Sequence, residues 1–233
     1  MTFHKPGTAA VLVPFVEKDG KWHLLFEQRA LHLRKQGGDI CFPGGRLNEG
    51  ESPREAALRE TEEELLISRE EIEIVAGLDP VCGPSLGLVW PFVGVWKGHA
   101  TIDMPSRAGD AISFLAAEAE STSLSRAADL TPLPLRWSEA EVDHTFLIPF
   151  SWFMEQEPLV VKTEIAQILP ENFPYDLIRG GREYNWQPKA RNLYFYRHPE
   201  AVIWGVTAEI IHDLVNVYRA ERKNDRPQTL NVL

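Results

Sequence analysis

The 233-residue sequence has little cysteine, a shortage of positive charge and no long apolar run. Its two cysteines, Cys41 and Cys82, cannot build a disulfide framework, and such low usage is typical of a reducing compartment. The formal net charge of −10 argues against nucleic acid or an anionic membrane as a partner. No stretch approaches the roughly 18 apolar residues of a membrane span, and the N-terminus does not read as a signal peptide. We therefore expect a cytoplasmic protein.

Hydrophobic patterning predicts an α/β chain with many short strands and two principal helices. One helix is expected from Ser52 to Leu66, and a second is expected to open at Pro199, with apolar positions at helical spacing. Strands before a helix, further strands and a terminal helix imply a mixed β-sheet between helices, in one domain over residues 1–233. The strands are expected at residues 8–16, 22–29, 39–42, 72–76, 88–96, 145–150, 160–168 and 193–196.

Two segments do not fit that pattern, and we expect them to be insertions. Residues 98–138 are rich in alanine and serine and read as a flap or lid, with a helix expected near residues 111–120. Residues 169–190 are irregular and carry several prolines and glycines. The sequence leaves the roles of both segments open.

The start of the first helix is well marked. Ser52 offers an N-cap oxygen, and Pro53 occupies the first helical position. Glu55 follows at the third helical position, from which its side chain can reach back to complete a capping box. No helix breaker then occurs up to Leu66, so the register of the residues between is predictable.

Three glutamates on that helix share one face. Glu60, Glu63 and Glu64 stand at i, i+3 and i+4, so their carboxylates repel one another within a single turn. Oxygen ligands of this kind suit a hard divalent cation, Mg²⁺ or Mn²⁺, better than zinc. Glu51 is near enough to join through water, and Arg59 can pair with one carboxylate and hold it in place. The alternative is a solvated, glutamate-rich helix without a ligand.

A glycine pair precedes the helix. Gly44 and Gly45 let backbone come near a ligand without a β-carbon in the way. A glycine turn, a helix and a cation held by carboxylates together resemble a site that hydrolyses phosphate anhydrides. Residues 45–67 also resemble the Nudix box, with matches in register at Gly45, Glu51, Arg59, Glu60, Glu63, Glu64 and Ile67.

Leu66 departs from the Nudix box, because the family has a glycine there. That glycine ends the helix in a left-handed conformation, which leucine adopts only at a cost. We therefore expect the helix to run further or to turn differently.

The resemblance implies an α/β/α sandwich of the Nudix type, with a mixed β-sheet. It implies that Glu60 and Glu64 are the principal ligands of Mg²⁺ or Mn²⁺, assisted by Glu63 and Glu51, and that Arg59 belongs to the same catalytic set. A carboxylate then takes the proton from the attacking water. The sequence does not choose between a glutamate of the box and Glu141 for that role.

A second resemblance concerns the substrate. A coenzyme A signature, found upstream of the box in Nudix proteins of the CoA-diphosphatase type, keeps its spacing here at Arg29, Ala30, Arg34, Gly38 and residues 42–45. Glu27 replaces the usual threonine. The signature implies hydrolysis of coenzyme A or acyl-CoA to (acyl-)phosphopantetheine and adenosine 3′,5′-bisphosphate. The groups expected at the substrate are Arg29, Arg34, Gly44 and Gly45, and Lys35 and Arg46 add cations beside the turn.

Two alternatives stay open. The chain could be a Nudix hydrolase for another nucleoside diphosphate derivative, such as ADP-ribose or a nucleotide sugar. It could also be a catalytically silent Nudix module that senses a nucleotide, although three repelling carboxylates argue against silence. The expected partner is a small-molecule nucleotide, and a homodimer is left open.

Overall fold

A computed structural model describes residues 8–83, 87–99, 135–165, 169–186 and 189–225. Most of the expected insertion at 98–138, including the helix expected near 111–120, lies outside these residues. Within the described ranges, no helix combines the length and apolar character needed to cross a membrane.

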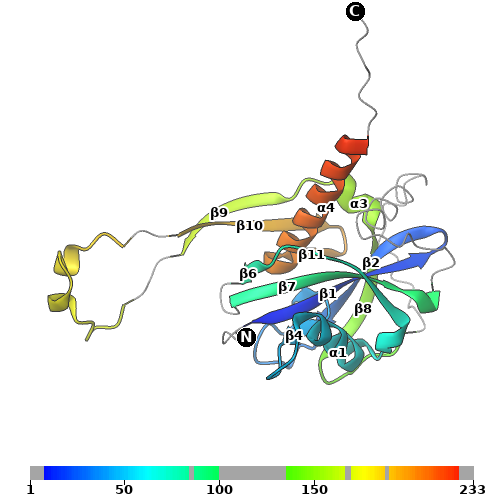
Figure 1. Cartoon of the computed structure of the whole chain (residues 1–233), viewed down its shortest axis with the longest axis horizontal. Coiled ribbons are helices and arrows are strands. Elements are labelled where there is room, and N and C mark those ends of the chain that lie inside the picture. The colour runs from blue at the N-terminus through cyan, green and yellow to red at the C-terminus, as the bar shows by residue number, and fades with distance from the viewer. Residues whose placement is uncertain (1–7, 84–86, 100–134, 166–168, 187–188, 226–233) are drawn as a thin grey trace, which may run out of the picture.

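The centre of the molecule is an eight-stranded mixed sheet built around β1 (Figure 1). β1 runs antiparallel to β2 and β4 and parallel to β7. β8 pairs with the other edge of β2, and β5 and β6 pair with β7. The strands of this sheet are β1 (Ala9–Lys18), β2 (Lys21–Arg29), β3 (Ile40–Cys41), β4 (Gly44–Arg46), β5 (Ile72–Gly77), β6 (Val81–Gly83), β7 (Gly87–Trp96) and β8 (Val142–Pro149).

Helices cover both faces of this sheet, which confirms the expected α/β/α sandwich. α1 (Pro53–Leu65) shares one core with β1 residues such as Leu12 and Val16, which point to its side of the sheet. On the other face, β1 residues such as Val13 and Phe15 join the core formed with α3 (Phe150–Glu155) and α4 (Gly205–Asp225). A strand buried on both faces needs apolar residues at nearly every position, and β1 has them.

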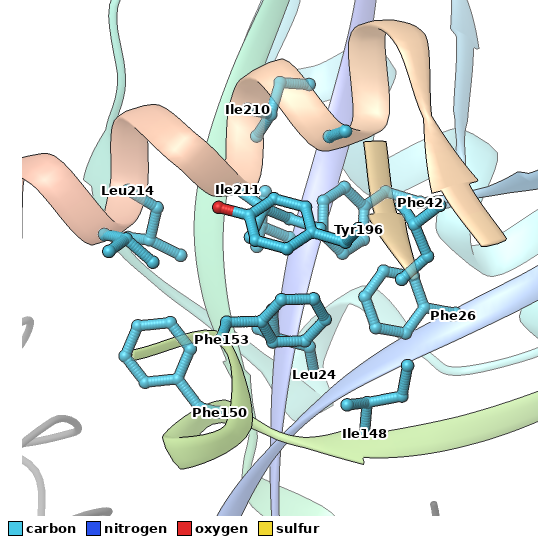
Figure 2. Close-up of a cluster of buried hydrophobic side chains, with 14 of the residues drawn as sticks. Leu24, Phe26, Phe42, Ile148, Phe150, Phe153, Tyr196, Ile210, Ile211 and Leu214 are labelled. Atoms are coloured by element: carbon cyan, nitrogen blue, oxygen red, sulfur yellow. The ribbon is translucent and has the colours of Figure 1, made fainter. Parts of the chain in front are cut away.

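The larger core is rich in aromatic rings, as Figure 2 shows. Phe26 on β2 stacks on Phe42 with ring centroids 5.0 Å apart. Phe153 of α3 meets Tyr196 edge to face at 5.3 Å, which joins the central sheet to the C-terminal part of the chain. This packing holds Phe42, and with it the adjoining turn at Gly44, against the sheet.

A second, three-stranded sheet precedes α4. Its order is β11 (Ala201–Trp204), β10 (Lys189–His198) and β9 (Leu159–Ile165). Between β9 and β10 lie two short 3₁₀ turns, η3 (Tyr175–Leu177) and η4 (Gly181–Glu183), within the segment that we expected to be irregular. Two other 3₁₀ turns, η1 (Arg69–Glu71) and η2 (Lys97–His99), flank strands of the central sheet.

The expectation that Pro199 opens the final helix is wrong. β10 continues to His198, a turn follows, and β11 occupies Ala201–Trp204 before α4 begins at Gly205. Residues of β11 alternate between buried and exposed, which is strand periodicity. Gly205 has φ +65°, a backbone conformation open to glycine, and there the strand gives way to the helix.

Leu66 also differs from expectation, because α1 neither extends nor turns differently. The helix ends at Leu65, and Leu66 takes the left-handed conformation itself, with φ 53° and ψ 28°. Its side chain is 54% exposed, whereas Ile67 after it is buried. Burial of Leu65 and Ile67 on either side holds Leu66 in a conformation that costs a non-glycine residue roughly 1–2 kcal/mol.

This strain predicts that Leu66→Gly stabilises the protein relative to Leu66→Ala. Both variants remove the same exposed side chain, but only alanine keeps the β-carbon that clashes in the left-handed region. We expect the free energy of unfolding in urea to be about 1 kcal/mol higher for the glycine variant. Equal stability of the two variants would mean that Leu66 carries no strain.

Candidate active site

α1 begins at the capping box that the sequence predicts. The backbone N–H of Glu55 donates to Ser52 Oγ at 3.3 Å, and the N–H of Ser52 donates to Glu55 Oε2 at 2.9 Å. Buried Ala56 and Ala57 then seat the helix against the sheet. With the start and the buried face fixed, the Glu60 and Glu64 side chains meet the glycine turn in β4.

Arg59 holds three of the predicted carboxylates. Its Nε donates to Glu51 Oε1 at 2.8 Å, and its Nη1 lies 2.9 Å from Glu60 Oε1 and 3.1 Å from Glu63 Oε2. Its Nη2 also donates to the carbonyl oxygen of Arg46 at 3.1 Å. The hydrogen bond from Arg59 is the main cause of a lowered pKa at Glu51. The pairing of Arg59 with the carboxylates, expected from the sequence, is therefore present, and it involves three of them.

Glu64 is the innermost carboxylate, with a side chain only 2% exposed. Its Oε2 accepts a hydrogen bond from the Gly44 N–H at 2.8 Å, and its Oε1 lies 3.5 Å from Arg29 Nη1. Burial, followed by the negative charge of Glu27, raises the pKa of Glu64. Burial also raises the pKa of Glu60, against the opposing effect of Arg59. Both carboxylates therefore stand where added positive charge is favourable.

Glu27 lies beside this site and is fully buried. Its Oε1 accepts a hydrogen bond from Cys41 Sγ at 3.3 Å, and its Oε2 has no hydrogen-bond partner among the described residues. Burial raises the pKa of the Glu27 carboxyl. Sequence reasoning noted Glu27 only as a replacement for threonine. Its place directly after the apolar run Leu24, Leu25 and Phe26 of β2 was the available sign that its carboxylate would be buried.

The glycine turn is shaped by what it touches. A β-carbon on Gly45 would overlap the carboxylate of Glu60, and one on Gly44 would overlap the Ala10 carbonyl and the Val11 backbone of β1. Gly44 thus lets β4 lie against β1, whereas Gly45 leaves room for the carboxylate of Glu60. We expected this glycine pair to allow a close approach to the backbone. Gly44 allows it for β1, and Gly45 allows it for the side chain of Glu60.

The donor set fits a divalent cation with oxygen ligands. Four carboxyl groups, Glu51, Glu60, Glu63 and Glu64, face two guanidinium groups, so the acidic groups outnumber the basic ones. Within the described part of the chain, no three acidic, histidine or cysteine side chains converge as a finished metal cage. Mg²⁺ does not need one, because one or two carboxylates commonly hold it together with water and substrate phosphates. Glu60 and Glu64 fit that role because both lie at the glycine turn, although Arg59 contacts Glu60 as well as Glu51 and Glu63.

A cavity of about 660 Å³ opens beside the glycine turn. Its lining includes Arg29, Gly44 and Gly45, three of the residues predicted to contact substrate, together with Lys35 and Arg46. Arg34, the other arginine expected there, is exposed and is not among the lining residues.

The far wall of the cavity comes from residues that sequence reasoning did not assign to the site. Arg191 of β10 lines it and pairs with Glu209 of α4 at 2.9 Å. Trp204 of β11 lines it as well, and its ring stacks on Phe195 with centroids 6.1 Å apart. No local motif links these residues to the box, because more than a hundred residues separate them from it.

The sequence is similar to several known proteins. The family model described as NUDIX domain matches residues 6–137. Nudix hydrolase 3 of Caenorhabditis elegans is 46% identical over 72 residues, 31% of this chain and 30% of that protein, so the match spans under a third of the worm protein. An uncharacterized Nudix hydrolase, NudL of Salmonella newport, is 29% identical over 208 residues, 88% of this chain and 80% of that protein.

Solved structures with a related arrangement include a C. elegans Ap4A hydrolase in a binary complex. It has a TM-score of 0.41 and 18% identity, over 61% of this chain and 80% of that one. The NUDIX domain of Shewanella oneidensis NrtR, complexed with ADP ribose, has a TM-score of 0.37 and 16% identity, over 64% of this chain and 76% of that one.

The surplus of negative charge predicts that Mg²⁺ stabilises the folded protein. The ion binds only where folding brings Glu60 and Glu64 together, so the melting temperature should rise with Mg²⁺ concentration; a concentration 100 times the dissociation constant adds about 2.7 kcal/mol. The Glu60→Gln/Glu64→Gln double variant should lose most of this response in the same thermal melts. An equal shift in both proteins would place the ion elsewhere.

The two glycines should respond differently to alanine. Gly44→Ala meets backbone atoms of β1, so the free energy of unfolding should fall by about 1–3 kcal/mol. Gly45→Ala meets only the flexible end of Glu60, so it should keep nearly normal stability while losing Mg²⁺-dependent stabilisation. Thermal melts with and without Mg²⁺ measure both effects. A Gly45→Ala protein with a full Mg²⁺ response would contradict the placement of Glu60.

Proposed function

This chain belongs to the Nudix family, and from the signature upstream of its box we propose that it hydrolyses the diphosphate of coenzyme A or an acyl-CoA. The products are (acyl-)phosphopantetheine and adenosine 3′,5′-bisphosphate. The observation that carries the choice of substrate is the cavity of about 660 Å³ that leads away from the catalytic turn. It lies within the roughly 300–1,000 Å³ typical of sites for small organic ligands.

The lining of the cavity supports a substrate with several phosphates and large organic parts. Arg29, Lys35, Arg46 and Arg191 bring positive charge to a chain that is acidic overall. Such cations suit a diphosphate together with a separate 3′-phosphate. Trp204 presents an aromatic face on which a purine base can stack. Apolar residues between them suit the pantetheine and acyl portions, and these include Val11, Ile40, Leu193, Val206 and Ile210.

Glu60 and Glu64 would hold Mg²⁺ or Mn²⁺, and Glu63 and Glu51 assist from the outer side of Arg59. A divalent cation bound there neutralises charge on the phosphate oxygens and lowers the pKa of water. Arg59 keeps the carboxylates in place, and Gly45 leaves space beside Glu60.

The proton of the attacking water goes to a carboxylate. Glu141 remains a candidate besides the glutamates of the box, because its charge contributes to the raised pKa values of Glu60 and Glu27. Its backbone carbonyl accepts a hydrogen bond from the Ala30 N–H at 2.8 Å, which fixes this loop beside the signature segment.

The proposal is tested by an assay with Mg²⁺ or Mn²⁺ over CoA, acyl-CoAs, dephospho-CoA, ADP-ribose and nucleotide sugars, with the products identified. We expect CoA or an acyl-CoA to have the highest kcat/KM. Hydrolysis of ADP-ribose with equal or higher efficiency would assign the enzyme to the wider class of nucleoside diphosphate hydrolases. No turnover of any compound would favour a nucleotide-sensing module.

Neighbouring cations provide a matched pair of variants. Lys35 lines the cavity and Arg34 does not, although both are exposed residues of one loop. A charge-assisted hydrogen bond contributes about 1.5–3 kcal/mol, so Lys35→Gln should lower kcat/KM for CoA roughly 10- to 150-fold, and Arg34→Gln should change it little. If Lys35 binds the 3′-phosphate, its loss should hardly affect dephospho-CoA. A larger loss of kcat/KM in Arg34→Gln than in Lys35→Gln would assign the contact with the substrate to Arg34.

A further inference from the structure

The strands β9 and β10 form an arm that projects from the body of the protein (Figure 1). β9 is the edge strand of its sheet, and it pairs only with β10 within the described residues. An edge strand presents a row of unsatisfied N–H and C=O groups, which proteins usually protect with charge, proline or a covering segment. β9 has the sequence Leu-Val-Val-Lys-Thr-Glu-Ile, without proline and with apolar residues over most of its length.

The apolar side chains of β9 are unusually accessible. Leu159, Val160, Val161 and Ile165 are each between 40% and 50% exposed. They lie on both faces of the strand, because successive side chains alternate between faces. Exposed apolar residues along an open strand edge are typical of a surface that another strand covers.

We propose that β9 pairs antiparallel with β9 of a second copy of this chain, about a two-fold axis at Thr163. The register is chosen by charge. With Thr163 opposite Thr163, Lys162 of each copy faces Glu164 of the other, and this favourable pair occurs twice. On the opposite face of the ribbon, Val161 of each copy faces Ile165 of the other.

Neighbouring registers with the same symmetry lack this complementarity. A two-fold axis at Lys162 sets lysine opposite lysine and Val160 opposite Glu164. An axis at Glu164 sets the two glutamates opposite each other. Like charges directly opposite in a ladder are destabilising, so both registers are disfavoured. The order of residues in β9 therefore specifies one pairing of the strand with itself.

The end of the arm supplies further contact surface. Residues 169–186, which we call the tip, gather aromatic rings: Phe173 lies 5.0 Å from Tyr175 and 5.9 Å from Trp186, between ring centroids. Leu177 is 80% exposed there. In the antiparallel arrangement each tip points towards the body of the other copy. This matters because a stable interface usually buries roughly 1,200 Å² or more, which one short ladder does not provide alone.

The first test is sedimentation of the full chain over a range of concentrations. We expect a dimer whose dissociation constant rises at least about tenfold in Lys162→Glu, because two attractive cross-strand pairs become two repulsive ones. Glu164→Lys should act in the same way. The Lys162→Glu/Glu164→Lys double variant should restore the dimer, because it restores opposite charges at both pairs.

A matched control is Lys97→Glu, which makes the same change of charge at an exposed lysine that pairs with Glu73 at 2.9 Å on the central sheet. It should leave the dimer intact. A wild-type chain that stays monomeric at every concentration would overturn the proposal and assign the edge to another protein. A dimer that ignores both single reversals, or a double variant that is not restored, would also overturn it.

The axis can be tested directly by disulfide cross-linking. Opposite residues in an antiparallel pair lie within disulfide reach, so Thr163→Cys should cross-link two copies on mild oxidation. Val160→Cys is the control, since its two copies would be six residues apart along the ladder, about 20 Å. Both variants need a Cys82→Ser background, because Cys82 is exposed. Cross-linking of Val160→Cys but not of Thr163→Cys would overturn the register.

Discussion

The close approach of α1 to β4 determines the geometry of the site. The Gly44 N–H donates to Glu64 at 2.8 Å, and the carboxylate of Glu60 occupies the space that a side chain on Gly45 would fill. β4 is in turn paired with β1, whose residues are buried on both faces of the central sheet. The glycine turn is therefore held by the core of the protein. A shift in the packing of α1 would therefore move the carboxylates of Glu60 and Glu64 together, relative to the backbone of Gly44 and Gly45.

Two arginines divide the negative charge of this site into an outer and an inner part. Arg59 binds Glu51, Glu60 and Glu63 towards the surface, and Arg29 lies beside the buried Glu64. Arg59 reduces the repulsion among the carboxylates that it contacts, so the helix can fold although three glutamates share a turn. In the inner part, burial raises the pKa of Glu64 and of the neighbouring Glu27, and one oxygen of Glu27 has no partner among the described residues. A cation with few protein ligands suits Glu64 together with Glu60, which lies at the same glycine turn.

The sequence predicted those parts of the site that depend on local spacing. The capping box, the face shared by Glu60 and Glu64, and the pairing of Arg59 all follow from distances of a few residues along one helix. Contacts between distant parts of the chain left no such signal. Arg191 and Trp204 lie far from the box in sequence, and only the docking of β10 and β11 brings them to the cavity. The error at Pro199 has a related cause, because residues 201–204 are too few to distinguish strand from helix by periodicity.

The cavity joins residues from the two ends of the chain. Ala9 and Val11 form part of one wall, and residues from Arg191 to Ile210 form the other. During synthesis the complete Nudix box leaves the ribosome long before the segment that closes this cavity. A nascent chain that ends before Gly205 already contains every carboxylate of the site, yet it lacks the part of the cavity wall that α4 supplies. The cavity is therefore completed late in biosynthesis, when α4 docks on the sheet.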